Sequence, residues 1–264
     1  MSRRIKLVVA YDGTNYCGWQ VQPNGITVQQ VLNEALSDLM GEEIRTIGAS
    51  RTDAGVHALG NVAVFDTRAR MPADRVSFAL NTRLPEDIRI QSSCEVPSDF
   101  HPRFTDTIKT YEYRILNRTF PDPTRRLNSL HWYGKLELEA MKEAAQYLVG
   151  EHDFKSFATA VPKVERTVRH IYEIKLTKED DMIRIRITGN GFLYNMVRII
   201  TGTLIEVGKG TYPPDEIKQI LAARDREKAG PTARALGLTL VQIRYPQWED
   251  KAVDNSPQKT EHCG

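Results

Sequence analysis

The chain has 264 residues, which is enough for one large domain or for two smaller ones that each bury a sizeable core. Hydrophobic residues make up 41% of it and charged residues 27%, a composition that excludes disordered and collagen-like proteins. The net charge is only +2, so a nucleic-acid partner would require the basic residues to be gathered on one face.

The first half of the chain predicts strands interrupted by two helices. A buried strand over residues 6–11 ends at the turn signal Asp12-Gly13. A helix begins at Thr27, which fits a capping box with Gln30, and ends at Gly41. Further strands are predicted over residues 44–48, 61–65 and 88–96, and a second helix over residues 72–80.

The second half contains a similar mixture of elements. Strands are predicted over residues 110–117, 168–177, 182–188 and 238–245, and helices over residues 138–149, 192–207 and 214–223. Gly150 and Gly208 are expected to end the first two of these helices. Over residues 182–188, isoleucines alternate with arginines, which predicts one buried and one polar strand face.

These elements fall into two similar sets, over residues 1–105 and 106–246. A polar tail, residues 247–264, follows them and is expected to be disordered. Because strands and helices do not alternate as βαβ units, we predict an α+β fold. Its sheet is expected to be mixed but mainly antiparallel, and to be built from two similar halves flanked by helices.

Several kinds of site are missing from the sequence. The three cysteines are far apart and the six histidines are scattered, which argues against a disulfide framework and a metal site. Glycine motifs for dinucleotides or phosphates are not present, so no nucleotide cofactor is expected. The apolar run over residues 7–10 is too short for a signal peptide and no stretch is long enough for a membrane, so we expect a cytosolic protein.

The basic residues are unevenly distributed along the chain. Between residues 101 and 135, Lys and Arg outnumber Asp and Glu seven to three, whereas the segment after residue 246 is acidic. A basic run can mark a nucleic-acid surface, but it is more often a solvated face. Both interpretations stay open from the sequence alone.

The first candidate site is the segment over residues 48–60, Gly-Ala-Ser-Arg-Thr-Asp-Ala-Gly-Val-His-Ala-Leu-Gly, in a predicted loop between two strands. It brings Arg51, Asp53 and His57 together among small residues, which would let a bulky substrate approach the backbone. Catalysis by Asp53 is one interpretation. The other, which spacing alone favours, is a turn in which the aspartate bonds its own backbone.

The second candidate site is the aromatic strand segment over residues 110–114. Tyr111 and Tyr113 are expected to point to the same face of the strand. An aromatic ring on the floor of a pocket can stack a nucleobase, which contributes about 1–3 kcal/mol. Burial of both rings in the core is the alternative, and this segment alone favours it.

The third candidate site is the segment over residues 189–198, where two glycines precede a predicted helix that contains Arg198. The rest of that helix is largely apolar. An arginine is costly to bury there unless a carboxylate or phosphate meets it, although its side chain can also extend to the surface. The pattern therefore predicts an anionic partner for Arg198.

Together these segments resemble one family, the tRNA pseudouridine synthase A family. Residues 51–58, Arg-Thr-Asp-Ala-Gly-Val-His-Ala, are similar to its catalytic signature, and residues 11–20, Tyr-Asp-Gly-Thr-Asn-Tyr-Cys-Gly-Trp-Gln, are similar to its first-strand motif. Residues 109–113 look like its tyrosine motif, and residues 192–198 look like its arginine motif. The segments come in the family's order, and the likeness runs from about residue 4 to residue 246.

The resemblance implies the pseudouridine synthase fold with a central RNA-binding cleft, and an enzyme that isomerises uridine to pseudouridine in the anticodon stem-loop of tRNA. It implies that Asp53 is the essential carboxylate, acting as a nucleophile on C1′ or C6 or as a base on the sugar. We expect Arg198 to pair with Asp53, Tyr111 to stack the flipped base, and Arg51 to hold the displaced strand or its phosphate. The family also implies a homodimer that spans the tRNA, and neither a cofactor nor a metal.

Two positions depart from the family's pattern. Ser50 stands where glycine is frequent, and residues 61–65 stand where a glutamine and a histidine are common. We expect neither departure to touch a residue with an assigned role. Three alternative functions remain: a non-catalytic RNA-binding protein of the same fold, a retaining glycosidase, which would need a second carboxylate, and a synthase that acts on other RNA uridines.

Overall fold

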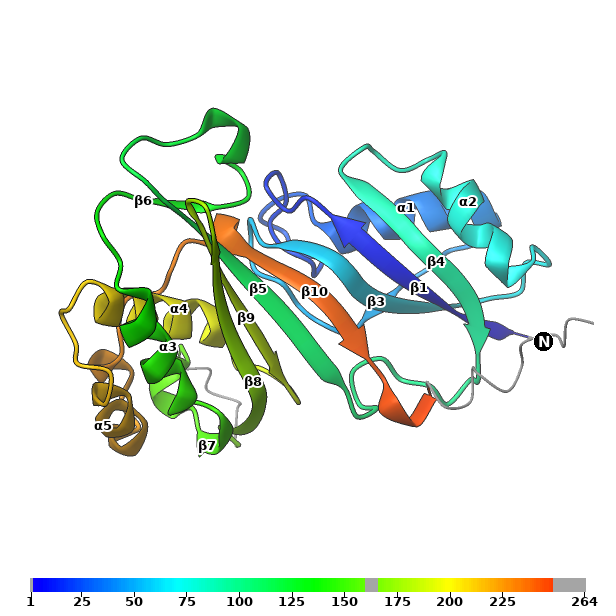
Figure 1. Ribbon diagram of the computed structural model, residues 1–264. Helices are drawn as coiled ribbons and strands as arrows, with labels where there is room; N and C mark the ends of the chain where they lie inside the picture. The colour runs from blue at the N-terminus through cyan, green and yellow to red at the C-terminus, as the bar shows by residue number, and fades with distance from the viewer. Residues whose placement is uncertain (1, 160–165, 249–264) are drawn as a thin grey trace, which may run out of the picture.

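The computed structural model describes residues 2–159 and 166–248, and a single mixed sheet runs through them (Figure 1). The strands are β1 (Arg3–Tyr11), β2 (Ile47–Gly48), β3 (His57–Thr67), β4 (Ile88–Val96), β5 (Ile108–Asn117), β6 (Leu130–Trp132), β7 (Gly150–Asp153), β8 (Val168–Glu179), β9 (Met182–Gly189) and β10 (Leu238–Arg244). The strand order is β4-β1-β3-β10-β5-β9-β8-β7, with β2 attached to β3 and β6 attached to β5. Neighbouring strands run antiparallel, except that β10 is parallel to β3 and β6 is parallel to β5. The predicted α+β fold with a mixed, mainly antiparallel sheet is therefore confirmed.

The α-helices of the described residues form two groups. They are α1 (Val28–Met40), α2 (Val76–Asn81), α3 (Leu138–Gln146), α4 (Met196–Gly208) and α5 (Glu216–Ala223). Helices α1 and α2 contact each other, and α2 packs on β4, whereas α3 packs on α4 and β8 at the other end of the sheet (Figure 1). None of the helices in the described part of the chain is long and apolar enough to span a membrane.

Local sequence accounts for several of these elements. In β9 the isoleucines at 183, 185 and 187 are fully buried, while Arg186 is exposed, as the alternation predicts. Helix α1 is capped by Thr27, whose hydroxyl oxygen accepts a hydrogen bond from the backbone N–H of Gln30 at 3.3 Å. The side chain of Gln30 does not complete a capping box, because it donates to Glu34 instead.

The two halves of the chain meet at β10. This last strand lies between β3 and β5, where Thr239 and Leu240 pair with His57 and Ala58 of β3. Its other edge pairs with β5 over most of its length. The predicted boundary at residue 105 falls in the connection between β4 and β5. A segment from the end of the chain thus joins both halves into one sheet.

The sequence prediction was wrong at the start of α4, which begins at Met196 rather than at residue 192. Asn195 adopts a left-handed conformation with φ 60°, which a helix cannot continue through. Phe192 and Leu193 pack against the core from the preceding loop. Apolar spacing cannot distinguish such loop contacts from a first helical turn.

Three other boundaries also differ from the prediction. Helix α3 ends at Gln146, because Leu148 is buried from a turn and Gly150 already begins β7. The strand predicted over residues 44–48 is reduced to Ile47–Gly48. The predicted loop over residues 49–60 ends at residue 56, because pairing with β10 extends β3 back to His57.

The start of the tail predicted to be disordered is ordered. The Trp248 ring meets the Phe100 ring edge-on at 5.2 Å between centroids, and Gln247 donates a hydrogen bond to Asp106. A large aromatic side chain close to an exposed edge of the core favours packing over disorder. The rest of the predicted tail, residues 249–264, lies outside the described residues.

Candidate active site

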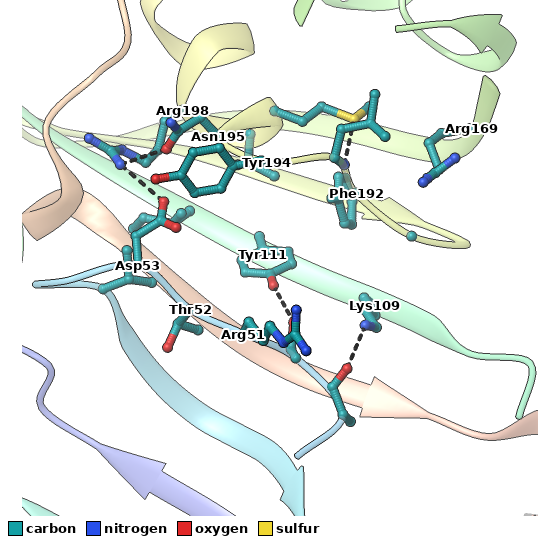
Figure 2. A pocket seen from close by; sticks show the side chains of 18 of the residues that line it. Arg51, Thr52, Asp53, Lys109, Tyr111, Arg169, Phe192, Tyr194, Asn195 and Arg198 are labelled. Atoms are coloured by element: carbon teal, nitrogen blue, oxygen red, sulfur yellow. Dashed lines mark hydrogen bonds and ion pairs between the residues drawn. The ribbon is translucent and has the colours of Figure 1, made fainter. Parts of the chain in front are cut away.

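A cavity of about 820 Å³ opens between the two halves of the chain. It is lined by residues 49–53 of the loop before β3, called here the Asp53 loop, by the start of β5, and by the segment over residues 190–198. Figure 2 shows Asp53 and Arg198 at one end of this cavity, Lys109 and Arg169 at the other, and Tyr111 between them. We call these the carboxylate end and the cationic end.

The carboxylate end is formed by one ion pair. Arg198 donates a hydrogen bond from Nη1 to Oδ2 of Asp53 at 3.0 Å, and the two side chains are 18% and 21% exposed (Figure 2). The predicted contact between these side chains is therefore present. Among the described residues, none donates a hydrogen bond to the other carboxylate oxygen, Oδ1. This oxygen is left to face the cavity.

Arg198 is held in place by groups other than Asp53. Its Nε donates to the carbonyl oxygen of Ala233 at 2.8 Å, and its Nη1 also donates to Oδ1 of Asn195 at 2.8 Å. The backbone N–H of Ala233 returns a bond to the carbonyl of Arg198. Neither partner was predicted from the sequence. Asparagine is the residue type that most readily adopts the left-handed conformation after glycine, so Asn195 three residues before Arg198 is the sequence signal that could have identified one of them.

The backbone of the Asp53 loop is supported by the segment after β1. Trp19 donates its backbone N–H to the carbonyl of Thr52, and Gly55 donates to the carbonyl of Tyr16. A Cβ atom at Gly18 would lie 2.5 Å from the carbonyl oxygen of Thr52, so only glycine permits this approach. The first-strand motif therefore supports the loop that carries Asp53.

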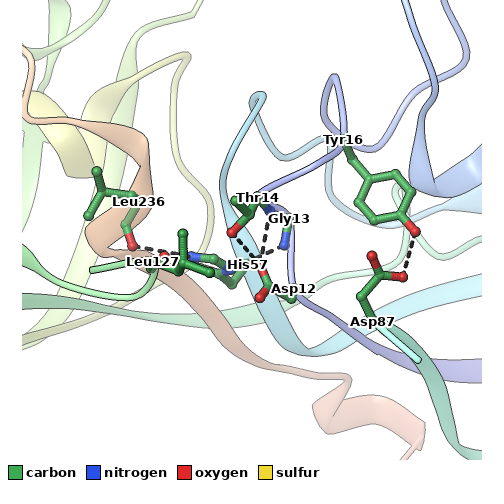
Figure 3. Close-up of polar contacts among 8 residues, drawn as sticks. All are labelled: Asp12, Gly13, Thr14, Tyr16, His57, Asp87, Leu127 and Leu236. Atoms are coloured by element: carbon green, nitrogen blue, oxygen red, sulfur yellow. Dashed lines mark hydrogen bonds and ion pairs between the residues drawn. The ribbon is translucent and has the colours of Figure 1, made fainter. Parts of the chain in front are cut away.

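His57 lies in the same sequence segment as Asp53 but does not line the cavity. Its Nδ1 accepts a hydrogen bond from the N–H of Gly13 and lies 3.1 Å from Asp12, while its Nε2 lies 2.9 Å from the carbonyl oxygen of Leu127 (Figure 3). His57 thus joins segments of the scaffold outside this cavity.

Asp12 is ionised beside this imidazole. Burial opposes its ionisation, but hydrogen bonds from Thr14 and the nearness of His57 outweigh that effect and lower the pKa of Asp12 below its ordinary value (Figure 3). The neighbouring pair formed by Tyr16 and Asp87 adds a further bond of 2.6 Å. These contacts connect the first-strand motif to β3 and to the start of β4.

Tyr111 occupies the floor of the cavity and is nearly buried, at 8% exposure. Its hydroxyl shares a hydrogen bond of 2.9 Å with Oγ of Ser50, and its ring meets that of Phe192 edge-on at 5.2 Å. Burial, together with the charge of Asp53, raises the pKa of Tyr111 to about 12. Tyr113 points to the same side of the strand but lies wholly in the core.

The expectation that neither departure from the family pattern touches a residue with an assigned role is wrong for Ser50, which contacts Tyr111, while Asn61 contacts Ser50. Ser50 bonds the hydroxyl of Tyr111, and Asn61 donates from Nδ2 to the carbonyl of Ser50 at 3.1 Å. Asn61 also donates to the hydroxyl of Tyr11, which shares a bond of 2.7 Å with Oγ1 of Thr52. Buried polar groups must find partners, and here those partners come from segments far apart in sequence.

The sequence predicted only some of the residues at the cationic end. Arg51 is exposed at the cavity wall, as its proposed contact with RNA would require. Arg103 and Lys109, both from the basic run, line the cavity with Arg169, whereas Arg118 of the same run is paired with Asp181. Neither interpretation of the run therefore holds for all its members.

Tyr194 is a further aromatic residue of the cavity, and its place there was not predicted from the sequence. Its ring lies beside the ion pair of Asp53 and Arg198 in Figure 2, and it is 52% exposed. An exposed aromatic ring inside the arginine motif is the signal that could have indicated it. Across the residues described, 2–159 and 166–248, no group of three or more His, Cys, Asp or Glu side chains could hold a metal ion.

Comparison with known proteins relates the chain to one family. The model of a family described as tRNA pseudouridine synthase matches residues 7–105 and 144–246. A protein named tRNA pseudouridine synthase A from Ruminiclostridium cellulolyticum is 51% identical over 244 residues, which cover 92% of this chain and 100% of that protein. One of the same name from Acetivibrio thermocellus is 49% identical over 243 residues, which cover 92% of this chain and 100% of that protein. The solved archaeal box H/ACA sRNP Nop10-Cbf5 complex matches at a TM-score of 0.34 and 11% identity over 90% of this chain and 46% of that chain, a likeness too remote to bear on the site.

Proposed function

Because the chain belongs to the tRNA pseudouridine synthase family, we propose that it isomerises uridine to pseudouridine in tRNA and that Asp53 is the carboxylate that carries the reaction. In this reaction the N1–C1′ bond breaks, the base turns, and a C5–C1′ bond forms. One proton leaves C5 and one is gained at N1. Bonds and electrons therefore balance without an oxidant or a reductant.

One observation supports the role of Asp53 above all others. Of the described residues that line the cavity, it alone carries a carboxylate, and Arg198 contacts only its Oδ2. Oδ1 is then available as a nucleophile on C1′ or on C6, or as a base on the sugar, and these three roles remain alternatives. The single carboxylate also disfavours a retaining glycosidase, which uses two.

Tyr111 and Arg51 have supporting roles in the proposal. A uridine inside a stem must leave the base stack before a side chain can reach it, which costs a few kcal/mol. The ring of Tyr111 offsets part of that cost by contacting the flipped base. Its hydroxyl stays protonated at neutral pH, because its pKa is about 12, so it acts as a hydrogen-bond donor. Arg51 holds the displaced strand or its phosphate.

The proposal extends to the target and the assembly. We place the target uridines in the anticodon stem-loop, as the resemblance of the sequence motifs implies, and we propose a cytosolic homodimer that spans the tRNA. A chain with a net charge of only +2 gains a wider basic surface when two copies act together.

The decisive experiment measures tritium release from tRNA that carries uridine labelled at C5. Wild-type protein releases tritium, because the proton at C5 is lost in the reaction. Asp53→Asn keeps tRNA binding, but its turnover falls by more than about 10³-fold, because a neutral amide replaces the charged carboxylate. Asp66→Asn is the matched control: Asp66 is also paired with an arginine, Arg4, but lies outside the residues that line the cavity.

Each alternative function leaves a different product. A non-catalytic RNA-binding protein binds tRNA and releases no tritium. A glycosidase releases free uracil, and a synthase for other RNAs forms pseudouridine in those RNAs but not in tRNA. Substantial pseudouridine formation by Asp53→Asn would refute the role of Asp53.

A further inference from the structure

The cationic end of the cavity carries positive charge that the protein itself does not neutralise. Arg103, Lys109 and Arg169, called here the cation cluster, line this end, and Arg51 lies next to Arg103. In the part of the chain that the structure describes, none of these four side chains forms an ion pair with a carboxylate. By contrast, Arg198 at the other end is paired with Asp53.

The cluster is held in position by uncharged groups. Lys109 donates from Nζ to the carbonyl of Ala49 at 3.1 Å, and Arg103 donates from Nη2 to the carbonyl of Gly48 at 3.0 Å. Arg169 donates from Nη1 to the carbonyl of Val168 at 2.7 Å. Carbonyl oxygens orient these cations without cancelling their charge. Each guanidinium has five N–H groups, so each keeps donors free for a ligand.

Mutual repulsion between the cations of the cluster contributes to lowering their pKa values. Burial, followed by the charges of Arg103 and Arg169, lowers the pKa of Lys109 to about 8. Burial and the charge of Arg51 likewise lower the pKa of Arg103. A bound anion would relieve this repulsion.

We propose that the cation cluster binds a backbone phosphate of the RNA beside the target uridine, a site that rests on the function proposed above. Uracil is neutral and cannot balance the cluster, whereas a nucleotide carries its negative charge on the phosphate alone. The carboxylate of Asp53 repels that phosphate from the other end of the cavity. The nucleotide is thereby oriented with its sugar and base toward Asp53 and Tyr111 and its phosphate toward Lys109 (Figure 2).

The proposal predicts a coupling between the cluster and single phosphates of the substrate. Synthetic tRNAs that carry a neutral methylphosphonate at one position near the target uridine are bound to wild-type protein and to Lys109→Met and Arg169→Met. One such substitution should weaken wild-type binding about tenfold but should add little to the loss already caused by the variants. Losses that simply add at every position would overturn the proposal.

Salt dependence supplies a second measurement that does not require modified RNA. Log affinity falls linearly with log salt concentration, and removing a lysine that contacts a phosphate makes this slope less steep by about one. Lys109→Met should show this change, and Lys109→Arg should restore the slope because it keeps the charge. Lys175→Met is the control, since Lys175 is exposed on β8 outside the residues that line the cavity. An unchanged slope in Lys109→Met would contradict the proposal.

Two further checks distinguish failure of the phosphate site from misfolding of a variant and from failure of the proposed function. Thermal unfolding shows whether each variant is folded. If a methionine variant does not fold, Lys109→Arg and Arg169→Lys are used in its place. If wild-type protein forms no pseudouridine, the proposed function fails, whatever the binding data show. If it forms pseudouridine and the losses are additive, only the phosphate site fails.

Discussion

The two ends of the cavity differ in how their charges are balanced. At the carboxylate end, the guanidinium of Arg198 meets the carboxylate of Asp53 at 3.0 Å, so the charges balance before any substrate arrives. At the cationic end, the hydrogen-bond acceptors that the cation cluster finds among the described residues are backbone carbonyl oxygens. A balanced pair keeps its geometry in the free protein, which suits a reacting group, whereas unbalanced cations are stabilised only when an anion binds. Changes at the first end should therefore reduce turnover, and changes at the second should reduce affinity.

The largest effect that would test this comparison comes from Arg198. Arg198→Met should lower kcat by about 10²–10³-fold with little change in tRNA affinity, because Asp53 loses the partner that orients it. Single-turnover pseudouridine formation and filter binding measure the two quantities separately. Arg4→Met, which breaks the pair with Asp66 outside the cavity, is the control. A loss of affinity with unchanged turnover would reverse the assignment of the two ends.

A smaller effect is expected at Tyr111, which lies between the two ends. Tyr111→Ala should lower kcat/KM by about 10–100-fold through the lost ring contact, whereas Tyr111→Phe should lower it by no more than about fivefold. Thermal unfolding must accompany the kinetics, since the ring is only 8% exposed and its removal leaves a cavity. Equal losses in both variants would assign the main role to the hydroxyl.

The affinity of the cationic end for RNA should depend on pH. Because the pKa of Lys109 is about 8, the affinity of the wild type for tRNA should fall several-fold between about pH 7 and pH 9, as the amine loses its proton. Lys109 faces Arg103 and Arg169, which do not titrate in this range, and shares the cavity with Asp53 and with Tyr111, whose pKa is about 12. Lys109→Arg should abolish the decrease. A decrease of the same size in that variant would assign the titration to another group.

Lys109 should also affect the stability of the free protein. Its pKa in the folded state, about 8, lies below the ordinary value of 10.5, so the unfolded chain binds the proton more tightly. The free energy of unfolding should therefore rise between these two pH values, and Lys109→Met should remove that rise. Urea unfolding over this range measures the effect. A fall in the free energy of unfolding with pH that depends on Lys109 would contradict the sign.

The smallest effect concerns Ser50, one of the two departures from the family pattern. Ser50→Gly removes the hydrogen bond to the hydroxyl of Tyr111, which is worth about 1 kcal/mol, or about fivefold in kcat. In a Tyr111→Phe background the same change should have no further effect, because the partner hydroxyl is already missing. A full effect in that background would mean that Ser50 acts through the backbone of the Asp53 loop instead.

Part of the cavity lining was predictable because some residue types need a particular kind of partner wherever they are buried. An arginine in an apolar helix needs an anion, and this requirement led from Arg198 to its contact with Asp53. The alternation in β9 and the cap at Thr27 followed from rules that span only a few residues. In contrast, the contact of Ser50 with Tyr111 joins residues that are 61 positions apart, and no local pattern predicts it.

The sequence by itself determined the α+β class and the need of Arg198 for an anion, because these depend on short-range periodicity and on the cost of burying a charge, whereas Asp53 was singled out only by the resemblance of its segment to the family's catalytic signature. Tertiary structure alone decided where the helix of Arg198 begins, that β10 extends β3 back to His57, and that Trp248 packs on Phe100. It also decided that Lys109 and Arg169 lie at one end of a shared cavity. The reason is physical: pairing with a distant strand and the sharing of charge across a cavity depend on which segments meet, and a local sequence window does not contain that information.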